Sequence, residues 1–285
     1  MNSLQFEEAT PINTIDTIDT IDKINMCDFI NSTYVNFSFN MPVTTGIGIG
    51  AIEISLYLSI GFILRDELPA LKKMNIISYF WLLMTVLTGI WEFAFIIQYN
   101  KVHDYAEQFV QNDTHVWTTQ YDITYVNPWK LSRIFYAEYG AHADREYIAL
   151  DNHWSRVIEG SHAILCGVFA TLALYFKSHR KNTLFIISAT VSMSTQLMNS
   201  ILYMAQYFYQ MRDPNNVNYP SPDFPAGFAL WERAFMYVNV FWTLMPLYVI
   251  VMEYVLYGKE WICCQLRNKR YIVKKKYYDE QNYLY

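Results

Sequence analysis

Hydrophobic residues along the chain gather into five long stretches separated by polar segments. A membrane-spanning helix needs about 20 mostly apolar residues, and each of the five stretches is that long. In lipid, every backbone amide must find its partner inside its own segment, so the spans are predicted to be helices. We therefore predict an all-α fold, a five-helix transmembrane bundle, with spans near 43–64, 75–99, 156–176, 183–208 and 231–257.

The remaining segments are polar. Residues 1–42 contain a repeated Thr-Ile-Asp triplet at 14–22, which predicts a disordered, low-complexity tail. Residues 100–155 are expected to form a long loop between the second and third spans. Residues 258–285 are expected to form a basic tail.

Positive charge is distributed unevenly and predicts an orientation. Lys and Arg cluster in the short loops 65–74 and 177–182 and in the tail after Tyr257. The positive-inside rule places these segments, and so the C-terminus, in the cytoplasm. Glycosylation sequons begin at Asn31, Asn36 and Asn112, all on the opposite side. The basic tail is expected to meet anionic lipid headgroups, and nothing indicates a nucleic-acid partner.

The composition makes ionisable residues inside the spans conspicuous. Charged residues are 16% of the chain and hydrophobic ones 53%, whereas about a quarter of a soluble protein is charged. An ionisable side chain inside a span costs roughly 3 kcal/mol, so it usually faces a cavity. The candidates are Glu53, Glu92, Glu159 and His162, while Glu232 and Glu253, near the ends of the fifth span, are expected to reach water.

The spacing of these residues favours a shared ligand cavity. Glu159 and His162 are three apart and so share a helix face, as do Asn239 and Trp242 in the fifth span. Two carboxyl groups in an apolar cavity could act as proton donor and proton acceptor. The alternative is that these polar residues only hydrogen-bond the helices together. Their number in a five-span chain favours the cavity.

Other features have plainer interpretations. Gly46 and Gly50 have the small-xxx-small spacing that lets membrane helices approach closely, and Cys166 is expected to be a packing residue. The segment around 138–153 could suggest a metal site through His142, Asp144, Asp151 and His153, but this spacing fits no standard ligand pattern. We instead predict a hydrogen-bonded network there, beside the third span, and expect neither a metal nor a cofactor.

Several short motifs, in order, resemble those of one family. Glu159 follows a pattern that includes Glu138-Tyr139, and Gln196 and Tyr203 follow in the fourth span. The fifth span carries an N-x-x-W-x-x-x-P motif from Asn239 to Pro246. Together they resemble the EXPERA-domain family and, within it, the emopamil-binding proteins, which are sterol 8,7-isomerases. The remaining matching positions are Asp144, Tyr147, Ile148, Asp151, Asn152 and Gly167.

The resemblance implies a five-helix protein of the endoplasmic reticulum that binds a sterol or a hydrophobic amine. Family isomerases move a ring-B double bond from the 8 to the 7 position through a carbocation, without a cofactor, and family members can form homodimers. The resemblance implies that Glu92 and Glu159 are catalytic, and His162, which shares a helix face with Glu159, is predicted to be a third catalytic residue. The implied substrate-binding residues are Thr88, Trp91, Tyr203, Asn239, which orients the polar site, and Trp242, which stabilises the cation.

The chain also departs from the family pattern. Thr88 stands where the family has His, and His162 stands where it has Thr, so the two side chains have exchanged helices. One extra residue separates Asp151 from Glu159. Three hypotheses stay open: a sterol isomerase, a non-catalytic sterol or amphiphile binder, and an isomerase of a related lipid.

Overall fold

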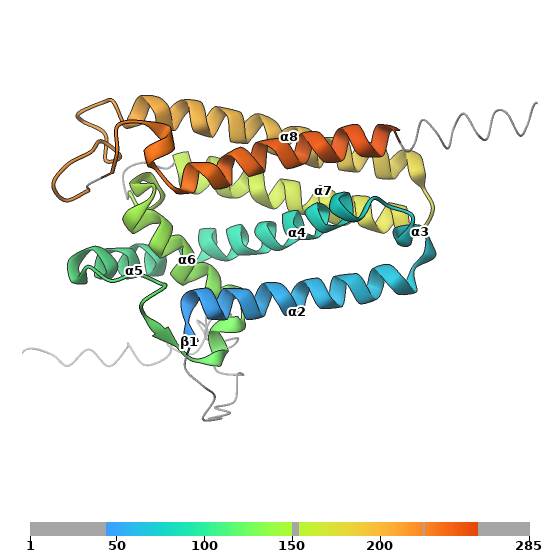
Figure 1. Ribbon diagram of the computed structural model, residues 1–285, viewed down its shortest axis with the longest axis horizontal. Helices are drawn as coiled ribbons and strands as arrows, with labels where there is room; N and C mark the ends of the chain where they lie inside the picture. The colour runs from blue at the N-terminus through green and yellow to red at the C-terminus, as the bar shows by residue number, and fades with distance from the viewer. Residues whose placement is uncertain (1–43, 150–153, 225, 256–285) are drawn as a thin grey trace, which may run out of the picture. The chain divides into compact units, whose positions relative to one another are not determined.

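Helices make up most of the chain that the structure describes. The computed structural model describes residues 44–149, 154–224 and 226–255, and Figure 1 shows their arrangement. The chain divides into two units, Met1–Met41 and Pro42–Tyr285, and all described residues belong to the second. The predicted N-terminal and C-terminal tails lie outside the described residues.

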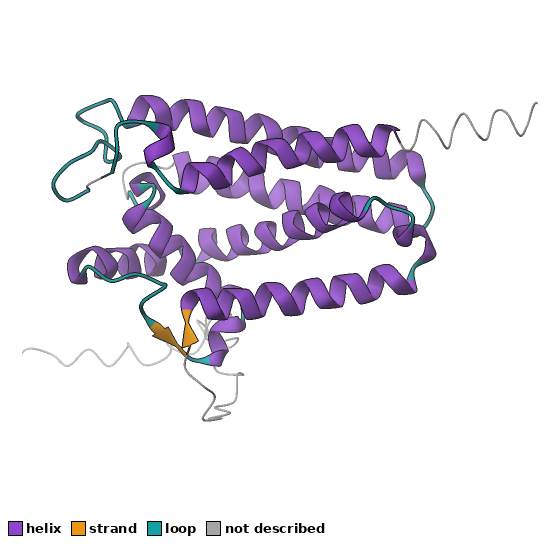
Figure 2. Cartoon of the chain, viewed as in Figure 1, coloured by secondary structure: helices purple, strands orange, loops and turns teal. Residues whose placement is uncertain are grey.

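Five of the described helices are long and apolar enough to cross a membrane, which confirms the predicted helical spans. The fifth, called here the C-terminal span, begins later than predicted because Leu230–Glu232 form a separate 3-10 turn, η4. Figure 2 shows how little of the described chain lies outside helices. The five are α2 (Gly46–Glu67), α4 (Ile76–Ile97), Arg156–Ser178, which contains α7 (Gly160–Ser178), α8 (Asn182–Gln210) and the C-terminal span (Phe235–Val255).

The centre of the bundle is the contact between α4 and α7. Among the five spans, α4 has the largest buried share, and α7 packs against both α4 and α8. A Cβ atom built on Gly167 of α7 would lie 3.1 Å from the Gly89 Cα of α4 and 3.3 Å from the Thr85 carbonyl oxygen. The two helix backbones therefore touch, which only small residues allow.

The predicted glycine pair of α2 also packs closely, but its partners lie in the segment between α4 and α7. A Cβ on Gly46 would lie 2.4 Å from Val116 Cγ2, and one on Gly50 would lie 3.0 Å from Phe135 Cζ. The spacing correctly indicated a close contact. It could not indicate the partner, because that segment was expected to be a loop.

The prediction of a long loop at 100–155 is wrong. The segment contains α5 (Tyr99–Asn112), β2 (Gln120–Tyr121), η1 (Ile123–Val126), α6 (Pro128–His142) and η2 (Arg145–Tyr147). In α5 the buried residues Tyr99, Val102, Ala106 and Phe109 recur at helical spacing, and the other face is polar. A search for long apolar runs misses such a helix. The short strand β2 pairs antiparallel with β1 (Thr44–Thr45), just before α2.

Helix α6 brings this segment to the end of the membrane bundle. Asn127 caps its first turn, accepting a hydrogen bond of 2.9 Å from the Trp129 amide, and Pro128 occupies the first helical position. The helix packs against both α4 and α5. Its aromatic side chains can therefore reach the interior of the bundle.

Candidate functional site

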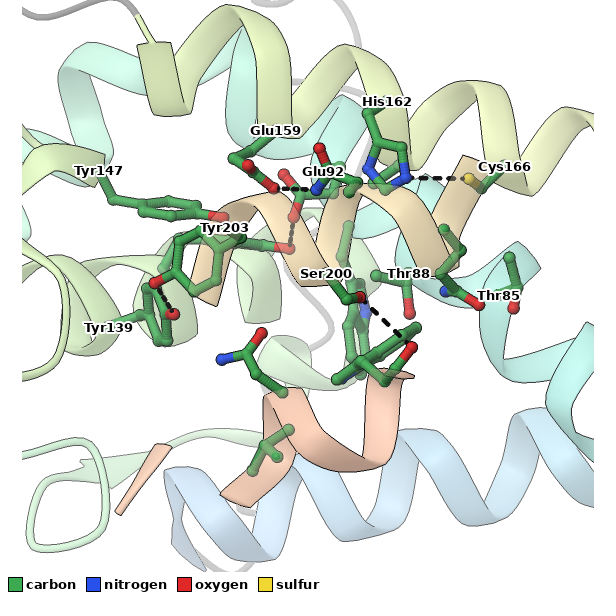
Figure 3. A pocket seen from close by; sticks show the side chains of 18 of the residues that line it. Thr85, Thr88, Glu92, Tyr139, Tyr147, Glu159, His162, Cys166, Ser200 and Tyr203 are labelled. Carbon is green, nitrogen blue, oxygen red and sulfur yellow. Dashed lines mark hydrogen bonds between the residues drawn. The ribbon is translucent and has the colours of Figure 1, made fainter. Parts of the chain in front are cut away.

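The candidate site is a cavity of about 370 Å³ among α4, α6, α7, α8 and the C-terminal span (Figure 3). Small-molecule sites typically have volumes of about 300–1,000 Å³. All the residues predicted for the site line this cavity: Thr88, Trp91, Glu92, Glu159, His162, Tyr203, Asn239 and Trp242. The fold thus brings together side chains that four separate spans supply.

Glu92 is a buried carboxylate in α4. Its side chain is 6% exposed, and its Oε1 accepts a hydrogen bond of 2.5 Å from the hydroxyl of Tyr136 on α6. Its Oε2 is also buried and has no hydrogen-bonding partner among the described residues. One oxygen is therefore held by the protein, and the other is available to a ligand.

Glu159 repeats this arrangement on the opposite helix. It ends the π-helical turn η3 (Trp154–Glu159), and its Oε2 accepts a hydrogen bond of 2.6 Å from Asn199 Nδ2 of α8. Its Oε1 is buried without a hydrogen-bonding partner in the described chain. A Cβ built on the next residue, Gly160, would lie 3.6 Å from Glu92 Oε2, so the two glutamates belong to one corner of the cavity.

His162 lines the cavity but is held differently. Its Nε2 lies 3.2 Å from Cys166 Sγ, one turn further along α7. Cys166 is 1% exposed, which agrees with the packing role predicted for it, although it also lines the cavity. Thr88, on the facing helix α4, donates a hydrogen bond of 2.8 Å to the carbonyl oxygen of Met84.

Two indoles, those of Trp91 and Trp242, line the cavity. Trp242 lies against Trp81, with ring centroids 4.7 Å apart, and Trp81 Nε1 donates a 2.9 Å hydrogen bond to Gln196 of α8. Trp91 Nε1 donates a 3.1 Å hydrogen bond to Glu53 Oε1 of α2. Glu53 therefore positions a residue of the cavity wall, although it was predicted as a candidate in its own right.

The prediction that Glu253 reaches water is wrong, whereas Glu232 is exposed in η4. Glu253 is only 3% exposed. It follows Val249 by four positions and so lies on the same face of the C-terminal span, which packs into the bundle. The position of Glu253 near the end of a span suggested that it is exposed, but its place on the buried face of the helix makes it buried.

A hydrogen-bonded network begins at the cavity-lining residues Tyr139 and Tyr203. A network was predicted for this segment beside the third span, but the partners are on α8 and in the segment that follows it. The Tyr139 and Tyr203 hydroxyls lie 2.6 Å apart, and Tyr203 donates a 2.7 Å hydrogen bond to Asp144 Oδ2. Asn218 Nδ2 donates a 2.7 Å hydrogen bond to Asp144 Oδ1. Burial raises the pKa of Asp144 to about 6, although these hydrogen bonds oppose the shift. Asp151 and His153 lie outside the described residues.

The direct partners of the two glutamates were not predicted. Asn199 belongs to a polar stripe on α8 with the spacing i, i+3, i+4, i+7, and every member of the stripe lines the cavity: Gln196, Asn199, Ser200 and Tyr203. That periodicity was visible in the sequence and could have identified Asn199. Tyr136 was hidden because its helix was expected to be a loop.

The cavity extends to the protein surface between α6 and the C-terminal span. Val238 and Phe135 line it, yet they are 55% and 37% exposed. Both are apolar; Phe135 belongs to α6 and Val238 to the C-terminal span. An apolar molecule could therefore reach the glutamates from the side of the bundle.

No family model, no curated protein and no solved structure matches this chain. The chemistry of the site is therefore inferred from its geometry and from the motifs in the sequence.

Proposed function

We propose that this chain is a membrane-embedded isomerase that moves a carbon–carbon double bond in a sterol or a related lipid. The observation that carries the proposal is the pair of buried glutamates in one largely apolar cavity. In each glutamate one oxygen is held by an amide or phenol, and the other has no partner in the described part of the chain. Such a pair is suited to moving a proton on an apolar substrate.

The proposed reaction uses both carboxyl groups. The electrons of the double bond take a proton from one carboxylic acid, which forms a C–H bond and leaves a tertiary carbocation. The other glutamate, as a carboxylate, then removes a proton from a neighbouring carbon, and that C–H bond's electrons form the shifted double bond. No electrons are gained or lost overall. The indole of Trp242 at the cavity wall would stabilise the cation.

Two features support the resemblance to the EXPERA-domain family despite the departures in sequence. Thr88 and His162, which have exchanged positions relative to the family pattern, line the same cavity. The extra residue before Glu159 falls near a π-helical turn, and such a turn holds one more residue than an α-helical turn does. Glu159 can therefore keep its place at the cavity.

The first test is expression in a yeast strain that lacks its own sterol 8,7-isomerase. The wild-type chain is expected to restore 7-ene sterols, and Glu159→Gln or Glu92→Gln should each abolish this. Glu253→Gln is the matched control, because Glu253 is also a buried carboxylate of a span but is not among the residues that line the cavity. Absence of 7-ene sterols despite good expression of the wild-type chain would contradict the proposal.

A second candidate function is a non-catalytic sterol or amphiphile binder. The observation that favours it is the contact of His162 with Cys166, which turns the imidazole toward a thiol. This hypothesis predicts saturable binding of a radiolabelled sterol or hydrophobic amine with no turnover. Turnover that disappears in Glu159→Gln would exclude it.

The five helices that are long and apolar enough to cross a membrane are consistent with a multi-pass membrane protein. We further propose that the protein resides in the endoplasmic reticulum with its basic loops in the cytoplasm. This proposal rests on the charge distribution and on the family resemblance.

A further inference from the structure

Three possible metal ligands gather on α6 and a neighbouring segment, outside the cavity. Glu138 and His142 are four residues apart on α6 and so share a helix face. His115 approaches them from the segment that follows α5. One nitrogen of each histidine and one carboxylate oxygen all lie within 4.8 Å of one another. This cluster has no part in the proposed isomerisation.

We propose that His115, Glu138 and His142 bind one Zn²⁺ ion, with a fourth position left for water or a carbonyl oxygen. Zinc takes histidine nitrogens and carboxylate oxygens at about 2.0–2.2 Å, usually in a tetrahedral arrangement. Ligand atoms in such a site lie roughly 3.4 Å apart, by tetrahedral geometry from those bond lengths. The His115 Nδ1 to Glu138 Oε1 distance is 2.8 Å, and no two of the three ligand atoms lie more than 4.8 Å apart, so side-chain rotations can bring all three to this spacing.

The surroundings hold these ligands in place. Glu138 Oε2 accepts a 2.9 Å hydrogen bond from the Val116 amide, which leaves Oε1 to face the histidines. The His115 ring is stacked on Trp117, with centroids 4.2 Å apart and planes 14° apart. The Thr114 carbonyl oxygen lies 3.1 Å from His142 Nε2. Such outer contacts orient the ligands of metal sites and support their affinity.

The simpler interpretation is that His115 and Glu138 form only a hydrogen-bonded pair. That pair does not account for His142, whose ring centroid is only 4.0 Å from that of His115. One ring nitrogen of His142 also lies within 4.8 Å of the other two ligand atoms, and two imidazoles with one carboxylate are a common set of zinc ligands. The sequence did not indicate this cluster, because His115 is far along the chain from Glu138 and His142 and belongs to a different element.

The ion would act as a structural clip. The Val116 carbonyl oxygen accepts a 2.9 Å hydrogen bond from the amide of Gly46, the first residue of α2. Zinc bound at His115 would therefore fasten the start of α2 to α6. Helix α6 also supplies Tyr136 and Tyr139 to the cavity, so the clip would steady the cavity wall without touching a substrate.

The test uses the full-length protein in detergent, washed with a chelator and titrated with ZnSO₄. We expect one Zn²⁺ per chain and a higher melting temperature with zinc. We also expect visible absorption from tetrahedral Co²⁺ when cobalt replaces zinc. His115→Gln and His142→Gln should each weaken zinc binding at least about tenfold and remove the thermal shift, since each loses a direct ligand.

His103→Gln is the matched control, because His103 is another half-buried histidine that lies 3.3 Å from a glutamate, Glu107. It should keep both the zinc and the thermal shift. The proposal is overturned if the folded wild-type protein binds no zinc, or if its zinc content equals that of the two variants. If a variant does not fold, the Co²⁺ spectrum of the wild-type protein decides, and its absence overturns the proposal. None of these readouts depends on isomerase activity.

Discussion

At the scale of single residues, the cavity is built by giving each glutamate one partner rather than two. Tyr136 holds Glu92, and Asn199 holds Glu159. A buried carboxyl oxygen without a hydrogen-bonding partner destabilises the folded protein, so such an arrangement usually belongs to a ligand site or a catalytic site. Glu53 is held in the same way, since its Oε1 accepts a hydrogen bond from the indole of Trp91.

Trp242 allows a test of the proposed cation. Trp242→Phe should keep part of the turnover and Trp242→Leu should lose more, because leucine fills space but offers no π electrons. Cation–π contacts contribute about 0.5–2 kcal/mol, which corresponds to roughly a 2- to 30-fold change in kcat. The measurement is product formation in reconstituted membranes, with Tyr237→Leu, an exposed aromatic of the same span, as control. Equal losses in the two Trp242 variants would argue against a cation beside this ring.

Asp144 makes stability depend on pH. Burial raises its pKa to about 6 in the folded protein, above about 3.9 in an unfolded chain. The folded state therefore binds this proton more tightly, and the group adds stability below about pH 4 that is lost as the pH rises through about 6. The difference is at most roughly 3 kcal/mol, at 1.36 kcal/mol per pKa unit.

Asp144→Asn should remove this contribution. Chemical unfolding in detergent between pH 4 and pH 7 would show a flatter stability profile for the variant than for the wild type. Asp104→Asn, at an exposed position on α5, should leave the profile unchanged. Parallel profiles for wild type and Asp144→Asn would show that the carboxyl group titrates normally.

At the scale of elements, the long apolar helices were predicted from the sequence, and the shorter helices with mixed apolar and polar residues were missed. The spans were found because bilayer thickness demands long apolar runs. Helices α5 and α6 were missed because both are shorter than a span and carry charged and polar residues among their apolar ones. Because α6 was missed, its residue Tyr136 could not be predicted as the partner of Glu92.

Which side chains meet in the cavity was largely predictable from the sequence, for a physical reason. Charged side chains in a span are rare enough that each one marks a face of its helix. The polar stripe on α8 carried the same signal more weakly, since Asn199 and Ser200 are not charged. The sequence could not reveal which oxygen of each glutamate is held, because that depends on contacts between distant elements.

The contact between α4 and α7 fixes the distance between the two glutamates, since Glu92 lies on α4 and Glu159 directly precedes α7. Gly167→Val is expected to destabilise the fold by about 1–3 kcal/mol, because its side chain would meet backbone atoms that cannot move aside. The small gain in helix propensity over glycine does not offset this. Unfolding in detergent measures the effect. Val168→Leu, at a 50% exposed neighbour, should change stability by less than about 0.5 kcal/mol, and equal stabilities for the two variants would refute the close contact.

At the scale of the whole molecule, the orientation of the chain can be tested through Asn112. This residue ends α5 and is exposed, so its sequon is open to glycosylation if the segment faces the lumen. We expect a glycosidase-sensitive mass shift in eukaryotic cells that decreases by one glycan in Asn112→Gln. A reagent restricted to the lumen that modifies the basic loop 65–74 would instead place the protein the other way round.

The central claim is that the two glutamates pass a proton to and from a lipid inside this cavity. The most direct measurement is mass spectrometry of the product when purified protein, reconstituted in lipid and D₂O buffer, is given an 8-ene sterol. The account predicts a 7-ene sterol carrying one deuterium, formed by the wild type and by Glu253→Gln but not by Glu159→Gln. Sterol that binds and is recovered unchanged and unlabelled from the wild-type protein would contradict it.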